Sequence, residues 1–151
     1  EQIGLAGIAR NSNGITVVGM YSAGKLFKIT NQPEGSVKIE AIPVERQLEN
    51  PDGMQFTDDG SLLIAEGAMA NGDGRLVRLN VLSSGSQPQS IETLASGLKS
   101  PVNLTISDGG VWVTESQIRH RLLPKQQAEI PERFFIHQLT FDFLKLSLDL
   151  T

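Results

Sequence analysis

The sequence predicts an all-β fold, a β-propeller of about three four-stranded blades, and three observations support this prediction. A segment that begins near residue 6 recurs near residue 52 and again near residue 100. Each copy carries an Asn-Gly or Asp-Gly pair where a tight turn is expected, because glycine supplies the positive φ that such turns need. The chain also has 15 glycines and seven prolines among 151 residues, which is typical of many short strands and turns.

Each repeat is expected to contain an apolar first strand, a nearly continuous apolar second strand, a third strand after a Gly-rich loop, and an outer strand. A continuous apolar run favours a strand that is buried on both faces. In order, the strands are predicted at residues 6–9, 15–18, 24–29 and 37–41, then at 52–55, 61–64, 74–79 and 90–94, then at 100–104 and 111–114. Four short strands in a repeat of about 50 residues match a propeller blade.

We expect one partial propeller domain over residues 1–151. The blades are predicted at about 4–49, 50–98 and 99–140, with a C-terminal strand or tail at 141–151. An antiparallel sandwich is the alternative, but it gives no reason for the gapless match between the first two repeats. Three blades cannot ring a channel, since propellers have four to eight. Either the chain is part of a longer one, so that an N-terminal half completes the ring, or copies associate as a homo-oligomer.

Composition excludes several classes of function. The net charge is −4 and the pI is about 5.1, without the basic stripe that a nucleic-acid-binding domain usually shows. No stretch has the roughly 18 apolar residues of a membrane span. The absence of cysteine excludes disulfides and cysteine-ligated zinc. The first residues do not form a signal peptide, and both the cytosol and a bacterial periplasm remain compatible with the sequence.

Residues 50–54 read Asn-Pro-Asp-Gly-Met, and a turn and an apolar strand follow at residues 58–66. This segment resembles the SMP-30/gluconolactonase/LRE-like family, which includes regucalcin. The resemblance extends over roughly residues 4–123 and implies the C-terminal half of a six-bladed propeller. It also implies hydrolysis of a sugar lactone or a related ester at a divalent cation, calcium or zinc, near the mouth of the central channel.

The resemblance carries over only part of the family's site. Family enzymes bind the cation through a Glu of an early blade, the Asn of an Asn-Gly segment and the Asp of Pro-Asp-Gly, which is also taken as the general base. The Asp corresponds to Asp52, but the Asn position holds Ala6, and the early blades have no counterpart here. A non-catalytic half-propeller that binds a partner or assembles is therefore the competing hypothesis, and an inactive truncated product is a third.

The chemistry of Asp52 supports its choice as the catalytic and metal-binding candidate. A carboxylate is a natural ligand for a hard cation, a bound cation acidifies water and polarises a lactone carbonyl, and the carboxylate could accept the water's proton. The structural alternative is a turn aspartate that hydrogen-bonds its own backbone.

Three further residues are candidates for binding substrate. Glu66 and Glu115 end equivalent second strands, where they could line a channel or cap the strand ends in solvent. Asn103 follows Pro101-Val102 and could face the channel or bond to its own backbone. Neither histidine, His120 or His137, has the spacing of a Ser-His-Asp hydrolase.

Two other features are better explained by structure than by function. Residues 71–74 read Asn-Gly-Asp-Gly, a partial calcium-loop pattern that lacks its terminal Glu and favours a flexible blade loop. Trp112 lies on a predicted core strand and is expected to pack.

Overall fold

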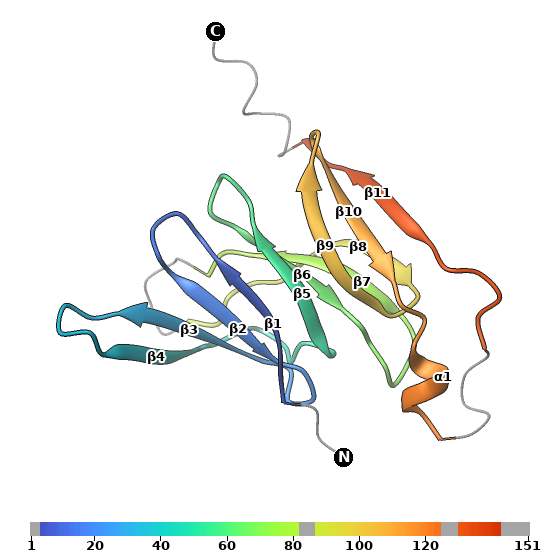
Figure 1. Cartoon of the computed structure of the whole chain (residues 1–151), viewed down its shortest axis with the longest axis horizontal. Coiled ribbons are helices and arrows are strands. Elements are labelled where there is room, and N and C mark those ends of the chain that lie inside the picture. Colours follow the sequence, from blue (N-terminus) through green and yellow to red (C-terminus); the bar gives the residue numbers. More distant parts are fainter. Residues whose placement is uncertain (1–3, 82–86, 125–129, 143–151) are drawn as a thin grey trace, which may run out of the picture.

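The computed structural model describes residues 4–81, 87–124 and 130–142. These residues form three antiparallel sheets that fan out side by side, with one short helix, α1 (Arg119–Leu122), after the third (Figure 1). The predicted partial propeller is confirmed. The one helix in the described part of the chain is too short to cross a membrane.

The sheets are numbered as blades in chain order, and within each one the strands pair in sequence. Blade 1 contains β1 (Leu5–Arg10), β2 (Thr16–Met20), β3 (Lys25–Asn31) and β4 (Val37–Ile42). Blade 2 contains β5 (Pro51–Phe56), β6 (Leu62–Glu66), β7 (Gly74–Leu79) and β8 (Glu92–Leu98). Blade 3 contains β9 (Pro101–Ser107), β10 (Gly110–Glu115) and β11 (Ile136–Thr140). Of the predicted C-terminal strand at 141–151, residues 143–151 lie outside the described residues.

The turns between first and second strands adopt the conformations that their sequences favour. Gly14 and Gly60 have φ of 81° and 84°. In the shorter turn of blade 3, Asp108 and Gly109 both have positive φ, 53° and 70°, as a two-residue type I′ hairpin requires. The Asp59 carboxylate accepts a hydrogen bond from the Ser61 N–H at 3.0 Å, which fixes the turn of blade 2.

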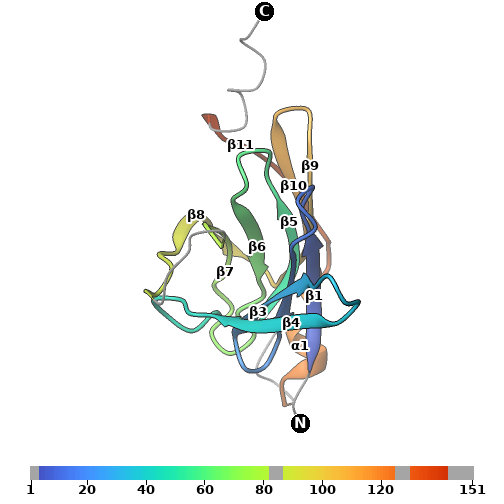
Figure 2. The same cartoon turned by 90° about the vertical axis from the view of Figure 1, so that its left-hand side faces the viewer.

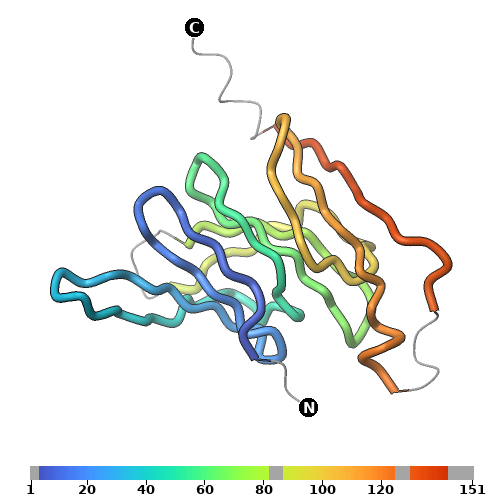
Figure 3. Tube along the Cα trace, in the orientation of Figure 1, coloured from blue at the N-terminus to red at the C-terminus, as the bar shows by residue number. Residues whose placement is uncertain are grey.

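The first strands of the blades are the inner ones. β1 lies against β5, and β5 lies against β9, as the chain trace also shows (Figures 2 and 3). The backbones approach so closely that a Cβ on Gly7 would lie 1.7 Å from the Asp52 carbonyl oxygen. A Cβ on Gly53 would lie 2.5 Å from Cα of Asn103. Glycine at these two repeat-equivalent positions therefore sets the spacing of the blades.

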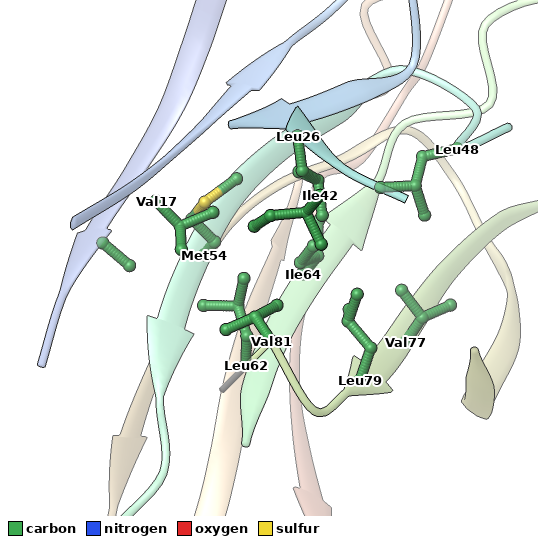
Figure 4. Close-up of a cluster of buried hydrophobic side chains, with 11 residues drawn as sticks. Val17, Leu26, Ile42, Leu48, Met54, Leu62, Ile64, Val77, Leu79 and Val81 are labelled. Atoms are coloured by element: carbon green, nitrogen blue, oxygen red, sulfur yellow. The ribbon is translucent and has the colours of Figure 1, made fainter. Parts of the chain in front are cut away.

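Blade 2 is covered on both sides. Alternate residues of β6 point to opposite faces, and all five are buried. The predicted burial of this strand on both faces is thus confirmed. The cluster toward blade 1 consists of Ala9, Val17, Leu26, Ile42, Leu48, Met54, Leu62, Ile64, Val77, Leu79 and Val81 (Figure 4). The cluster toward blade 3 consists of Leu63, Ala65, Leu76, Leu98, Leu104, Val111 and Val113.

One position that recurs on the three inner strands shows how a neighbouring blade changes the exposure of a side chain. Met54 and Leu104 each face the preceding blade and are only 7 % and 8 % exposed. Ile8 occupies the same position in blade 1, where no described blade precedes it, and is 65 % exposed. The side chain is apolar in all three repeats, so the neighbouring blade, and not the residue type, decides its burial.

Substitution to alanine at this position is expected to destabilise blades 1 and 2 unequally. Met54→Ala opens a cavity between two blades and should lower the free energy of unfolding by about 2–4 kcal/mol. Ile8→Ala removes a side chain that is mostly in solvent and should change it by less than about 0.5 kcal/mol in the monomer. Urea unfolding of the two variants measures the difference, and equal losses would contradict the assigned packing.

Candidate functional site

Asp52 lies on the inner strand β5 within an irregularity of its pairing. The register of β5 against β6 shifts between Pro51 and Met54, so Asp52 and Gly53 form a bulge. The carboxyl group is half-buried, and burial raises its pKa above the ordinary value for aspartate. Within the described residues the structure records neither a hydrogen bond nor an ion pair for this carboxylate. It is therefore a partly desolvated acid that stays available to a ligand.

Tyr21 is the second member of the site, and the sequence analysis missed it. Tyr21 is buried directly after β2, and its pKa is raised to about 12 by burial and, secondarily, by the negative charge of Asp52. Its phenol is therefore protonated at neutral pH and can donate a hydrogen bond. Tyr21 is the one tyrosine of the chain and stands where the other repeats have Gly67 and Ser116, which is the feature that could have identified it.

Asn50 connects these residues to the neighbouring loop. Its Nδ2 donates to the Tyr21 carbonyl oxygen at 3.4 Å, and its Oδ1 accepts from the Met69 N–H at 2.9 Å. Asn50 has a φ of 58°, a left-handed conformation that asparagine tolerates better than most residues. The residue before Pro51 therefore holds the start of β5, and with it Asp52, in place.

The three inner-strand bulges align across the blades. Ala6 is exposed on β1, and the following Gly7 contacts the Asp52 backbone. On the other side Asn103 is exposed beside Gly53, and its Oδ1 accepts a hydrogen bond from the Leu104 N–H at 2.9 Å. The fold thus brings Asp52 and Asn103 to neighbouring positions. Substrate binding by Asn103 stays a prediction.

Glu66 and Glu115 perform the same structural task in blades 2 and 3. Both side chains are buried at the ends of second strands. Glu66 accepts a hydrogen bond from the Glu49 N–H, and Glu115 accepts one from the Lys99 N–H, each at 2.7 Å. Each carboxylate ties the end of the second strand to the segment that enters the first strand. Their predicted contribution to substrate binding remains untested, and both are engaged by the backbone.

The carboxylates of Glu66 and Glu115 have different side-chain partners. Glu66 forms a bidentate pair with Arg46 at 2.8 and 2.7 Å, the geometry in which a guanidinium binds a carboxylate most strongly. Glu115 instead has Nε2 of His137, on β11, at 3.2 Å from its Oε1. A guanidinium therefore compensates the buried charge in blade 2, and an imidazole ring occupies the corresponding place in blade 3. This contact also gives the isolated His137 of the sequence a definite location.

The donors near Asp52 do not complete a metal site. The described residues contain no group of three or more His, Cys, Asp or Glu side chains that could hold a metal ion. Ala6 offers no ligand, whereas calcium takes six to eight oxygens and zinc usually takes four ligands. One carboxylate does not fit either cation without ligands from elsewhere.

The polar side chains of the Asn71–Gly74 stretch form hydrogen bonds and an ion pair with other groups of the protein. Asn71 donates from its Nδ2 to Glu49 at 2.6 Å, and its Oδ1 accepts a hydrogen bond from the Asp73 N–H at 2.8 Å. The Asp73 carboxylate accepts one from the Gly97 N–H and pairs with Arg75. These contacts use the oxygens that a calcium loop would need for its ion.

Comparison with known proteins identifies the fold. No family model and no curated protein sequence matches the chain. Among solved structures it is similar to a luciferin-regenerating enzyme, with a TM-score of 0.66 and 11 % identity over 91 % of this chain and 45 % of that one. An oxidoreductase assigned as a glucose dehydrogenase from Thermus thermophilus gives a TM-score of 0.57 and 17 % identity over 93 % and 46 %. The PQQ-bound aldose sugar dehydrogenase of Streptomyces coelicolor gives 0.54 and 12 % over 76 % and 40 %.

These similarities show the propeller fold alone, and they do not single out the regucalcin-type family. The chain spans less than half the length of each of these neighbours.

The raised pKa of Asp52 predicts a pH-dependent stability. Because this pKa is higher in the folded protein than in the unfolded chain, the folded protein binds the proton more tightly. Stability should therefore fall as pH rises above the ordinary aspartate pKa, and the loss should persist at neutral pH. Asp52→Asn should be more stable than the wild type at about pH 7 and lose this advantage at about pH 3. Urea unfolding at both values tests this, and an advantage that is independent of pH would contradict it.

The two buried glutamates should differ in their contribution to stability. Glu66→Gln removes the partner of a bidentate guanidinium and should cost roughly 2–3 kcal/mol of unfolding free energy. Glu115→Gln should cost less, because it leaves no permanent cation without its partner. The exposed Glu132→Gln is the matched control and should stay within about 0.5 kcal/mol of the wild type. Denaturant titration measures the unfolding free energy of each variant. A larger loss for Glu115→Gln than for Glu66→Gln would show that the ion pair with Arg46 does not determine the difference.

Proposed function

We propose that this chain forms one half of a propeller whose inner-strand site hydrolyses a cyclic ester, a sugar lactone or a related compound, with Asp52 as the general base. The observation that carries the proposal is the half-buried Asp52 carboxylate, which lies on the β5 bulge without a recorded partner among the described residues. Two acids at the neighbouring strand ends are paired within the protein, Glu66 with Arg46 and Glu49 with Arg75. Asp52 differs from them because its carboxylate stays available to a ligand.

The environment of Asp52 suits a proton acceptor. A carboxylate whose pKa is raised by desolvation is a stronger base than one in water. In the proposed reaction Asp52 takes one proton from a water molecule as its oxygen attacks the lactone carbonyl carbon. The ring C–O bond then breaks, and the departing oxygen receives the proton from Asp52, which yields a hydroxy acid. The protonated phenol of Tyr21 interacts electrostatically with this carboxylate, whose negative charge contributes to the raised pKa of Tyr21.

A divalent cation, calcium or zinc, belongs to the proposal only if further ligands join Asp52. Such a cation would polarise the carbonyl group of the substrate. Because the described residues offer one carboxylate, the remaining ligands would come from blades that complete the ring. The sugar lactone is favoured as the substrate class by the resemblance of residues 50–54 to the lactonase family. Two neighbouring structures also belong to enzymes named for sugars.

A non-catalytic role is the second candidate, and two observations favour it. Ala6 replaces the amide ligand beside Asp52, and no metal-ligand cluster occurs among the described residues. In that case the chain serves as a binding or assembly module, and Asp52 is a remnant of the site.

Two measurements on the purified chain test the proposal. Thermal unfolding with calcium, zinc or manganese ions reports binding, since a ligand at a hundred times its dissociation constant adds about 2.7 kcal/mol of stability. Proton release from glucono-δ-lactone above the spontaneous rate reports hydrolysis. Asp52→Asn should reduce the hydrolysis rate by about 100-fold or more and abolish any metal-dependent rise. The exposed Asp58→Asn is the matched control and should change neither. Hydrolysis that survives in Asp52→Asn would exclude this site, and no hydrolysis by the wild type would favour the assembly role.

A further inference from the structure

Tyr21 combines a buried side chain with a hydroxyl group that the fold does not use. The residue is 6 % exposed, and the hydroxyl groups of buried tyrosines usually find a hydrogen-bond partner. Among the described residues, however, the structure records no hydrogen bond for its Oη, and this oxygen is not one of the fully buried side-chain atoms that lack a partner. The hydroxyl group therefore reaches solvent and is available to a ligand.

The backbone of Tyr21 is fixed by two hydrogen bonds. Its N–H donates to the Gly4 carbonyl oxygen at 2.9 Å, and its carbonyl oxygen accepts a hydrogen bond from Asn50 Nδ2 at 3.4 Å. The Oη atom lies 3.5 Å from the point where a Cβ on Gly67 would stand. A longer side chain at position 67 would crowd the hydroxyl group, and glycine avoids this. The hydroxyl group is thus held in place by the fold and left without a covering side chain at position 67.

The end of β2 lies against the start of β5, and this contact brings Tyr21 towards Asp52. A Cβ on Gly19 would lie 3.6 Å from Cβ of Pro51, the residue before Asp52. The pKa of Tyr21 is raised first by burial and second by the charge of the Asp52 carboxylate, so the two groups are within electrostatic reach of each other. An acid and a neutral hydrogen-bond donor therefore lie near each other where blades 1 and 2 meet.

Hydrolysis of an ester needs two kinds of group, and Asp52 supplies only one of them. While the carboxylate takes a proton from water, negative charge develops on the carbonyl oxygen of the substrate, where a fixed hydrogen-bond donor stabilises it. A neutral phenol suits this place beside a general base, because a cation there would lower the pKa of the carboxyl group and make it a weaker base. The guanidinium group of Arg46, at a neighbouring strand end, is paired with Glu66 instead.

We propose that Tyr21 is a catalytic residue, which donates a hydrogen bond from its phenolic O–H to the carbonyl oxygen of the lactone as that oxygen becomes negatively charged. The water oxygen bonds to the carbonyl carbon, Asp52 receives one proton of the water, and the π electrons of the carbonyl group move to the oxygen that Tyr21 contacts. When the carbonyl group forms again, the ring C–O bond breaks and the ring oxygen takes the proton from Asp52. Tyr21 keeps its own proton throughout. This role of Tyr21 rests on the proposed hydrolysis at Asp52.

Tyr21→Phe tests this role, with glucono-δ-lactone as the substrate and proton release as the signal. Removal of one donor to a developing oxyanion lowers kcat by roughly 100- to 1,000-fold. The KM should change by less than about two-fold, because the hydrogen bond strengthens mainly in the transition state. Thr93→Val, which removes a hydroxyl group from an exposed residue of β8, is the matched control and should keep the wild-type kcat.

Two further measurements separate a catalytic role from a structural one. Because Oη has no recorded hydrogen bond among the described residues, Tyr21→Phe should unfold at the same urea concentration as the wild type. The chain has one tyrosine, so biosynthetic incorporation of a ring-fluorinated tyrosine changes Tyr21 alone. This analogue keeps the O–H donor, and the fluorinated protein should therefore keep a kcat close to that of the wild type.

The outcomes distinguish the role of Tyr21 from the proposed function. If the wild type hydrolyses the lactone, Asp52→Asn does not, and Tyr21→Phe equals the wild type, then the role of Tyr21 is overturned and the proposed function stands. A loss of kcat in Tyr21→Phe that accompanies a lower urea midpoint would also overturn this role, because it would assign the hydroxyl group to the fold. A wild type that hydrolyses no lactone would overturn both proposals.

Discussion

The burial of blade 2 on both faces is the constraint on which the rest of the structure depends. A single four-stranded sheet has two faces that need to be covered. Among the described residues, only blade 2 has a neighbouring sheet on each side. Every side chain of β6 is buried because Leu62 and Ile64 pack toward blade 1 while Leu63 and Ala65 pack toward blade 3. The outer blades are ordered by their contact with this sheet, and their remaining faces are correspondingly exposed. This explains why the chain has apolar surface at both ends of a well-packed centre.

The same packing positions the candidate site. Glycines at positions 7 and 53 allow the inner strands to approach within contact of their backbones, and the bulge in β5 sets Asp52 where the strands converge. Buried Glu66 then holds the entry to β5 through the Glu49 N–H. A carboxylate that has lost part of its hydration and gained no fixed partner costs stability. Such a cost is characteristic of functional sites, where groups are kept ready for a ligand instead of being satisfied within the protein.

Much of the fold could be predicted from the sequence because its repeats are local patterns. The turns at residues 13–14, 59–60 and 108–109 follow from glycine and its neighbours, and the outer strands β4 and β8 lie within a few residues of the ranges predicted for them. Asp52 could be chosen from its motif. Tyr21 stands out in the sequence only as the one tyrosine of the chain. Its relation to Asp52 could not be predicted, because it links two blades through space. The structural roles of Glu66 and Glu115 could not be predicted either. A buried glutamate is recognised by its partners, and Arg46 and His137 are distant from these glutamates in the sequence.

The sequence by itself determined the repeat, the strand order within each blade and the apolar character of the rows that pack, because these depend on local propensity and on a period of two. The tertiary structure decided which of the equivalent residues are buried. Ile8, Met54 and Leu104 are alike in sequence, yet one is exposed and two are not, since burial depends on whether a neighbouring blade is present. It also decided the electrostatics of the site, because the burial that raises the pKa values of Asp52 and Tyr21 exists only in the folded chain.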